Sequence, residues 1–329
     1  ALSEPQLLGA DDAAYTLREK RAEDFAKRCK KNGEDVGRFM GTYSNAVDHY
    51  TVMKADNRTK MGLLGRPAPS SLAYTVTTAQ PSQIRDAERG LDAFFYTCLR
   101  APANCSFAGS ATTPAELRSR YTALETKLKT KPLLGGAGTD NNKFDWSALH
   151  SFLTLAIHGP GWFPVLSNVL TEAETGAVGG WIGYVLTGVL RQGQDDFKSY
   201  FQSMTDAAPS VASIFSEWRL VCSKWKIDPV NKLDDTSGGP VTTQGKFVVL
   251  NGVGDPASSV EGAKGVVARF SPGVLVKTLA AGHTSFAATS NCLFGVFYTF
   301  FVLGQMPAEG TTCGDLFAAP FGVQLPPSF

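Results

Sequence analysis

The stretch FVVLNGVGDPASSVEGAKGVVARFSPGVLVKTLAAGHTS, residues 247–285, decides the fold. Short apolar runs rich in β-branched residues at 247–252 and 274–280 predict two strands, and the pattern at 259–270 predicts a helix between them. A strand, a helix and a strand at this spacing form a parallel unit with a crossover helix, and residues 290–303 predict a second helix after it. The sequence therefore predicts an α/β fold.

Two chemically reactive side chains follow these strands, Asp255 after the first and His283 after the second. Functional residues of open parallel sheets gather at the carboxyl ends of the strands, so the two should meet. A carboxylate can fix the tautomer of an imidazole and stabilise its charged form, which makes the imidazole a base for a hydroxyl nucleophile. Taken singly, Asp255 could be a helix cap and His283 a loop histidine, but the chain order Asp then His favours a catalytic pair.

The chain before this unit is mainly helical. Residues 12–31 and 45–55 predict helices, and the first of these should end before Asn32-Gly33. The runs KMGLLG at 60–65 and LAYTVTTA at 72–79 predict two more strands. From residue 83 to about residue 226 the pattern is helical almost throughout.

Three segments follow from this pattern: N-terminal helices and first core strands in 1–82, a helical cap in 83–232 and an α/β core segment in 233–329. Within the cap, Thr113-Pro114-Ala115-Glu116 combines an N-cap, a first-turn proline and a capping-box acid, so a helix should begin there and end at Lys131-Pro132. The glycine-rich residues 133–142 predict a loop without the context of a phosphate site. DDTSGGPVTTQGK, residues 234–246, predicts a flexible return.

Composition limits the classes of partner. At 329 residues, 43% of them hydrophobic, the chain can bury a large core, and 31 basic against 30 acidic residues give no signal for nucleic acid. The longest apolar run, Leu293 to Leu303, is shorter than the roughly 20 residues that cross a bilayer, so we predict no membrane span. We expect a short peptide or another small molecule as the partner. The chain begins with polar residues and without Met, which fits a processed mature form.

Cysteine usage indicates an oxidising compartment. Cys98 and Cys105 bracket one short loop, and Cys292 and Cys313 bracket one apolar helix, spacings that suit local disulfides. The sequons at Asn57 and Asn104 agree with a secreted glycoprotein. Chance sequons and buried thiols are the alternative. No cysteine or histidine cluster has metal-ligand spacing, and we predict neither a metal nor a cofactor.

Residues 247–292, with YTFFVLGQMPAEGTTCGDLFAAPFG after them, resemble the C-terminal region of the tripeptidyl-aminopeptidase-like (TAP-like) α/β-hydrolases, which are secreted serine peptidases and related hydrolases. DAERGLDAFFYTCLRAPANCSFAG, ELRSRYTALETKL and SEWRLVCSKW resemble the helical cap of that family, so the similarity extends over most of residues 20–323. The resemblance implies Asp255 as triad acid, His283 as base, and disulfides within the 98/105 and 292/313 cysteine pairs.

The sequence departs from that family at the nucleophile. Such enzymes present a serine in a Gly-x-Ser-x-Gly turn, and the chain contains no such motif. Ser70 and Ser71 are the nearest hydroxyls to the expected position, but Pro67 and Pro69 make the entry to a following helix unlike that turn.

A second departure concerns the sheet. The early strands and glycine-rich loop of the family should precede residue 20, and nothing there resembles them. The fold expected is thus a reduced α/β-hydrolase-like parallel sheet with a large helical cap. So small a sheet leaves a face or edge uncovered, and we expect self-association, a partner chain or a rearranged sheet to cover it.

The same departures leave Cys29 and Cys222 without the partners that the resemblance implies, so they are either free or paired with each other. His150 and His158 are interpreted as hydrogen-bonded histidines of the cap, and His49 as a residue on a solvated helix face. The aromatic residues of the cap are interpreted mainly as core: Trp162, Phe163, Trp181 and Tyr184.

Two functions remain open. The first is a secreted serine hydrolase or exopeptidase acting on short peptides or related small substrates through a Ser-His-Asp mechanism. The second is a hydrolase-like binding protein that has lost its nucleophile. Loss of the nucleophile removes most of the rate enhancement in enzymes of this type, so the two differ sharply in expected activity.

Overall fold

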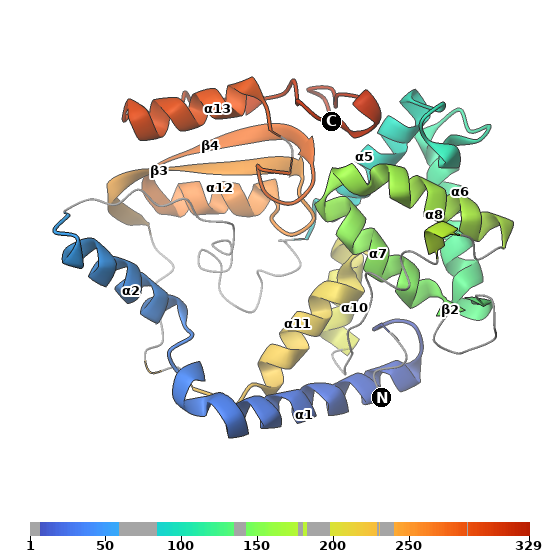
Figure 1. Cartoon of the computed structure of the whole chain (residues 1–329), viewed down its shortest axis with the longest axis horizontal. Helices are drawn as coiled ribbons and strands as arrows, with labels where there is room; N and C mark the ends of the chain where they lie inside the picture. Colours follow the sequence, from blue (N-terminus) through green and yellow to red (C-terminus); the bar gives the residue numbers. More distant parts are fainter. Residues whose placement is uncertain are drawn as a thin grey trace.

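The computed structural model describes residues 7–58, 84–134, 143–176, 180–182, 198–228, 230, 240–287 and 289–329 (Figure 1). The helices are α1 (Asp12–Gly37), α2 (Thr42–Ala55), α5 (Ala87–Arg100), α6 (Pro114–Thr130), α7 (Trp146–His158), α8 (Phe163–Thr175), α10 (Lys198–Ala207), α11 (Ala212–Lys224), α12 (Val260–Arg269) and α13 (Asn291–Phe297). The strands are β1 (Leu133–Leu134), β2 (Lys143–Phe144), β3 (Val241–Gly254), β4 (Phe270–Ala281) and β5 (Thr312–Cys313). This is a helix-rich α/β fold with a small parallel sheet, as the sequence predicts.

The sheet has the order β3-β4-β5, and both pairs are parallel. Val248 pairs with Val274 and Leu250 with Val276, so the two predicted strands lie side by side in register. The strand β3 also includes residues 241–246, which the sequence assigned to a flexible return. That prediction is wrong because β-branched Val241 and Thr242 pair with the start of β4, ahead of a register shift that lies before Phe247.

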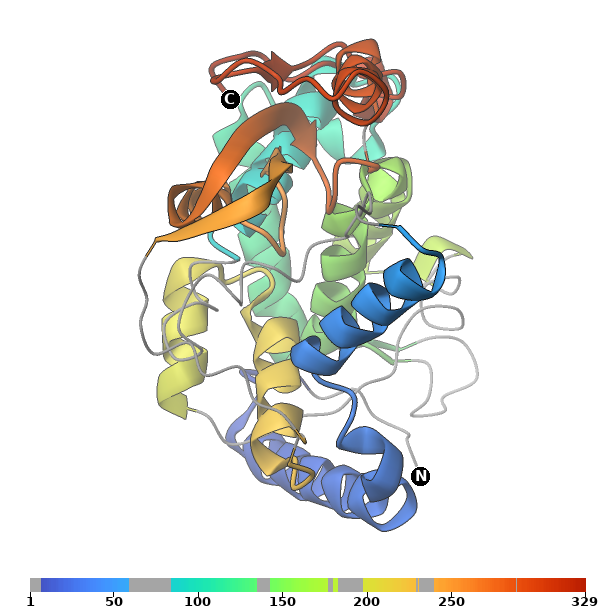
Figure 2. The same ribbon diagram turned by 90° about the vertical axis from the view of Figure 1, so that its left-hand side faces the viewer.

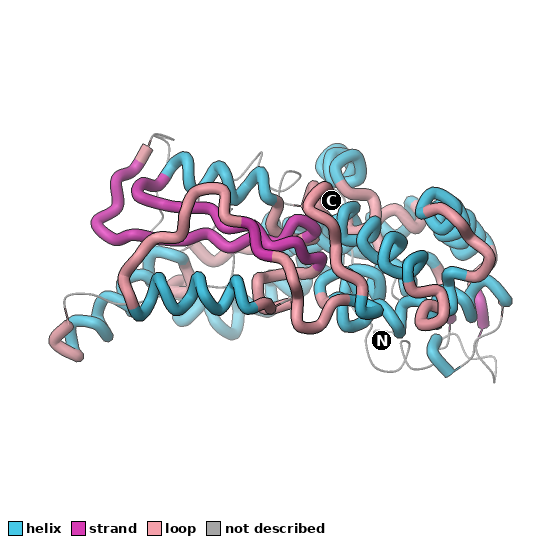
Figure 3. The backbone as a smooth tube through the Cα atoms, turned by 90° about the horizontal axis from the view of Figure 1, so that it is seen from above, coloured by secondary structure: helices cyan, strands magenta, loops and turns pink. Residues whose placement is uncertain are grey.

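Helices α12 and α13 lie on either side of β3 and β4 (Figure 3). Val296 of α13 packs on Val276 of β4, together with Cys313. The disulfide Cys292–Cys313 ties the first turn of α13 to β5. The helical pattern predicted to residue 303 continues past α13 as a π-helical turn, Tyr298–Val302.

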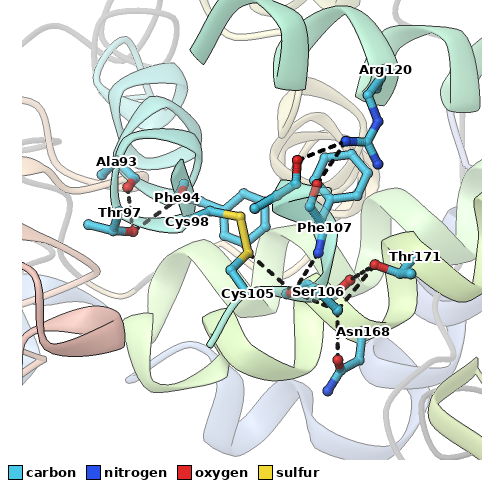
Figure 4. Close-up of a disulfide and its surroundings, with 12 residues drawn as sticks. Ala93, Phe94, Thr97, Cys98, Cys105, Ser106, Phe107, Arg120, Asn168 and Thr171 are labelled. Atoms are coloured by element: carbon cyan, nitrogen blue, oxygen red, sulfur yellow. Dashed lines mark hydrogen bonds between the residues drawn. A yellow bond between two sulfur atoms is a disulfide. The ribbon is translucent and has the colours of Figure 1, made fainter. Parts of the chain in front are cut away.

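The helical region has the larger core, built by α5, α6, α7 and α8. The disulfide Cys98–Cys105 joins the end of α5 to a short 3-10 helix at Ser106–Ala108, and the Ser167 hydroxyl accepts from the Phe107 amide (Figure 4). Arg120 of α6 lies over the Phe107 ring, 4.4 Å from its centroid, and donates to the Phe107 carbonyl.

Helix α6 begins where its capping signals predict. The Thr113 hydroxyl accepts from the Glu116 amide, and Lys131 is the C-cap residue. The Glu116 carboxylate accepts from the amide of Thr112, one residue before the N-cap. These local signals fix the helix because each satisfies a backbone amide that has no partner inside the helix.

Helix α1 packs on α11 across the base of the helical region (Figure 2). Its buried face includes Ala22 and Arg18, and the Arg18 guanidinium pairs with Glu217 of α11 at 3.6 Å. The prediction that this helix ends before Asn32-Gly33 is wrong. Gly33 adopts a non-helical conformation (φ −155°, ψ 22°), but the helix resumes and runs to Gly37.

Several predictions fall on residues that the structure does not describe. The expected strands at 60–65 and 72–79, with Ser70 and Ser71, lie outside the described residues. The sequence predicts a loop at 133–142. Residues 133–134 instead form strand β1, which pairs antiparallel with β2, and residues 135–142 lie outside the described residues. Within the described ranges, no helix combines the length and apolar character needed to span a bilayer.

Candidate active site

Asp255 and His283 meet at the carboxyl ends of β3 and β4. His283 Nδ1 lies 2.9 Å from Asp255 Oδ1 and 3.2 Å from Oδ2. The Asp255 side chain is 2% exposed and the His283 side chain 27% exposed. The carboxylate is thus buried behind an imidazole that still reaches solvent.

The Asp255 carboxylate is held by backbone amides. Oδ1 accepts from the amides of Ala257 and Ser258, both at 2.9 Å, and Oδ2 accepts from the amide of Thr284 at 3.0 Å. The helix that follows is capped by Ser259, so Asp255 is not its N-cap residue. Because these donors fix both oxygens, the carboxylate can orient the histidine ring without rotating.

A tight turn places His283 against this carboxylate. Gly282 has φ +105°, and a Cβ there would lie 2.6 Å from Pro160 Cδ. Both the conformation and the space require glycine. The next residue but one, Thr284, also has a positive φ of 71°, which turns its amide toward Asp255.

Helix α5 supports the site from behind. A Cβ on Gly90 would lie 3.1 Å from the Gly254 carbonyl oxygen, so the helix approaches the end of β3 closely. Asp86, beside the start of α5, accepts from the amide of Val260 at 2.7 Å and so helps to hold the first turn of α12. Burial raises the pKa of Asp86, an effect that this hydrogen bond opposes and the nearby Asp255 carboxylate reinforces.

A second histidine, His158 at the end of α7, lies beside His283. The ring centroids are 5.3 Å apart with the rings at 68°, and the His158 carbonyl accepts from the His283 amide at 2.7 Å. His158 Nδ1 donates to the Thr154 carbonyl at 2.6 Å. Burial lowers the pKa of His158, and the adjacent His283 lowers it further. The sequence interpretation of His158 as a hydrogen-bonded cap residue thus misses its place in the site.

The other sequence candidates lie away from this site. His150 is buried, and its Nε2 atom forms a hydrogen bond with the Glu125 carboxylate at 2.6 Å. His49 lies on the exposed surface of α2. Phe163 is buried as expected of a core residue, but Trp181 is 42% exposed, which corrects its assignment to the core. Tyr184 lies outside the described residues.

Two other groups of predicted residues are also placed. Asn57 and Asn104 of the sequons are exposed. Cys29 carries a free thiol, so it is not paired with Cys222, whose side chain the structure does not describe.

The arrangement can accept a proton at one defined atom. With Nδ1 donating to Asp255, the Nε2 atom of His283 is the basic nitrogen. No hydroxyl of the described residues forms a hydrogen bond to it. The described residues also contain no group of three or more metal-ligating side chains close enough to hold an ion.

Comparison with known proteins fits this geometry. Residues 208–313 match the model of a family described as TAP-like protein, a segment that includes both Asp255 and His283. No curated protein matches the chain. The part of the chain from α11 to β5, with its parallel strands and crossover helix, is therefore a TAP-like α/β-hydrolase region.

Proposed function

We propose that the protein is a secreted serine hydrolase that acts on short peptides or related small substrates, with His283 as the general base and Asp255 as its orienting acid. The observation that carries this proposal is the 2.9 Å contact from His283 Nδ1 to a carboxylate held by three backbone amides. The TAP-like match over the same residues supports a hydrolase rather than another α/β protein.

In this mechanism Asp255 keeps the proton of the neutral imidazole on Nδ1 and stabilises the imidazolium that forms during reaction. His283 Nε2 then takes the proton of a serine hydroxyl as the serine oxygen attacks the substrate carbonyl, and gives that proton to the leaving group. A water molecule, deprotonated by the same Nε2, then cleaves the acyl-serine ester, and the proton returns to the serine oxygen. Ser70 and Ser71 are the candidate nucleophiles from the sequence. The partial exposure of the His283 side chain supports this role, because a substrate can approach the ring from solvent.

A binding protein is the second candidate, and a specific observation favours it. The sequence contains no Gly-x-Ser-x-Gly motif, and no hydroxyl of the described residues pairs with His283. A chain of this kind would bind a small peptide beside the histidine without cleaving it. The oriented imidazole would then be a hydrogen-bonding group for the ligand.

Two disulfides and two exposed sequon asparagines support the proposed secretion. The Cys98–Cys105 and Cys292–Cys313 disulfides persist in oxidising compartments, and the exposed Asn57 and Asn104 are accessible to a glycosyltransferase. Expressed behind a secretion signal in a eukaryotic host, the protein should therefore reach the medium folded and with glycans that an endoglycosidase removes. An intracellular protein whose mass does not change on this treatment would contradict the proposed location.

A fluorophosphonate probe distinguishes the enzyme from the binding protein. We expect the wild-type protein to be labelled on a serine, the His283→Ala variant to lose labelling, and His49→Ala, which changes an exposed histidine on α2, to keep it. Peptide mapping of the adduct would identify the nucleophile. A folded wild-type protein that is not labelled would contradict the hydrolase proposal and favour the binding protein.

A further inference from the structure

The helix α13 and the turn after it expose an unusually apolar surface. The exposed side chains are Val302 (64%), Tyr298 (57%), Phe317 (56%), Phe294 (51%), Leu303 (49%) and Phe301 (46%), and they form what we call the aromatic face. An amphipathic surface helix presents polar residues on its outer side, whereas a helix that is apolar on all sides is normally buried. The surface of α13 that faces away from the sheet is therefore one that a partner would cover.

The rings of the aromatic face are already ordered. Phe294 stacks on Phe317 with centroids 5.9 Å apart, and Phe301 stacks on Phe297 at 6.3 Å. On the opposite side, Leu293 and Val296 are buried, and the first turn is held by the Cys292–Cys313 disulfide. Stacking limits the side-chain freedom of Phe294, Phe317 and Phe301 before association, which lowers the entropic cost of binding for these three rings.

Few charged side chains border the aromatic face: Lys246 donates to the Gly304 carbonyl, and Asp315 lies two residues before Phe317. Residues 278–308 contain no Asp, Glu, Lys or Arg, and the formal net charge of the whole chain is +1. Two copies could therefore approach with little electrostatic repulsion. A helix that lies on an anionic membrane surface usually carries Lys and Arg on its polar side, and α13 has neither.

The spacing of the exposed residues favours a partner helix. Phe294 of α13 and Tyr298 directly after this helix lie four residues apart, and the exposed Phe301 and Val302 continue from them in the π-helical turn Tyr298–Val302. A face of this kind can pack on an identical face across a two-fold axis, because each residue meets the same set of residues on the partner.

We propose that the aromatic face is the contact surface of a symmetric homodimer, in which α13 and residues 298–303 pack on the same segment of a second copy. The four half-exposed rings alone supply roughly 400 Å² per protomer, taking about 200 Å² for each fully exposed ring. With Val302 and Leu303, two copies bury roughly 1,000 Å², the lower limit for a specific interface. This surface differs from the uncovered face or edge of the sheet at which the sequence predicts self-association.

Sedimentation velocity over a concentration series tests the dimer. The wild-type protein should dimerise in the micromolar range, and Val302→Glu should raise the dissociation constant by about a hundredfold or more, since each copy then places an unpaired carboxylate in the contact. The matched control is Val52→Glu, which makes the same change at a 66% exposed position on α2 and should leave the dimer intact. Circular dichroism should show the same helical content in all three proteins.

Three outcomes would overturn the proposal: a wild-type protein that stays monomeric throughout the series, a Val302→Glu variant that dimerises like the wild type, or a Val52→Glu variant that dissociates equally. Binding of a monomeric wild-type protein to phosphatidylcholine vesicles, abolished by Val302→Glu, would assign the aromatic face to a lipid surface instead. None of these outcomes depends on hydrolase activity.

Discussion

Replacing Asp255 with Asn tests whether its carboxylate organises both the loop and the imidazole. The asparagine oxygen can keep the two hydrogen bonds from Ala257 and Ser258, but its NH₂ group replaces Oδ2, which accepts from the Thr284 amide. The variant loses that bond, places two donors against each other and weakens the bond from His283. Because the side chain is 2% exposed, water cannot substitute, and we expect a loss of about 2–4 kcal/mol in the free energy of unfolding.

Urea denaturation followed by tryptophan fluorescence measures this loss, and nuclear magnetic resonance of the imidazole reports the Nδ1 proton. The control is Asp35→Asn, because Asp35 is exposed and, among the described residues, its carboxylate accepts a hydrogen bond only from the amide of Val36. If Asp255→Asn were as stable as the control, the carboxylate would not organise the turn as its contacts indicate. If the protein is an enzyme, the same variant should also lose most of its turnover, because a neutral amide does not stabilise the imidazolium that forms during reaction.

Two further predictions concern the residues around His283. Gly282→Ala should lower the free energy of unfolding by about 2–5 kcal/mol in the same denaturation assay, because it adds a methyl group against Pro160 and strains a positive φ. The control, Gly161→Ala, has open space around its Cβ and should have little effect. For His158, the unfolded chain binds more protons than the folded chain below pH 6.5, since burial lowers the folded pKa. Its contribution to stability should be complete above that pH and fall as the pH drops toward the folded pKa. The His158→Asn variant, which keeps a donor for the Thr154 carbonyl, should show a shallower pH dependence, and an unchanged slope would contradict this assignment.

The parts of the fold that the sequence predicts are those with strong local signals. The sequence predicts β3 and β4 because their apolar runs are rich in β-branched residues. It predicts α6 because Thr113 and Glu116 can accept hydrogen bonds from backbone amides at the start of the helix. The meeting of Asp255 with His283 follows from parallel topology, which brings the carboxyl ends of neighbouring strands together.

The parts that it does not predict depend on contacts between distant segments. β5 has only two residues, and it forms because Thr312 and Cys313 lie against β4. His158 reaches His283 because α7 packs beside the end of the sheet, and nothing near His158 in the sequence indicates that approach. The sequence also does not predict how α1 continues past Gly33. The glycine there indicates an end to the helix, and the sequence around it does not indicate that the helix resumes.

The hydrogen bond from the His283 amide to the His158 carbonyl has a mechanical consequence. It joins the last residue of α7 to the loop that carries the basic imidazole, and Pro160 packs on Gly282 at the same junction. Any shift of α7 relative to the sheet would therefore move the His283 backbone and change the distance from its imidazole to the Asp255 carboxylate.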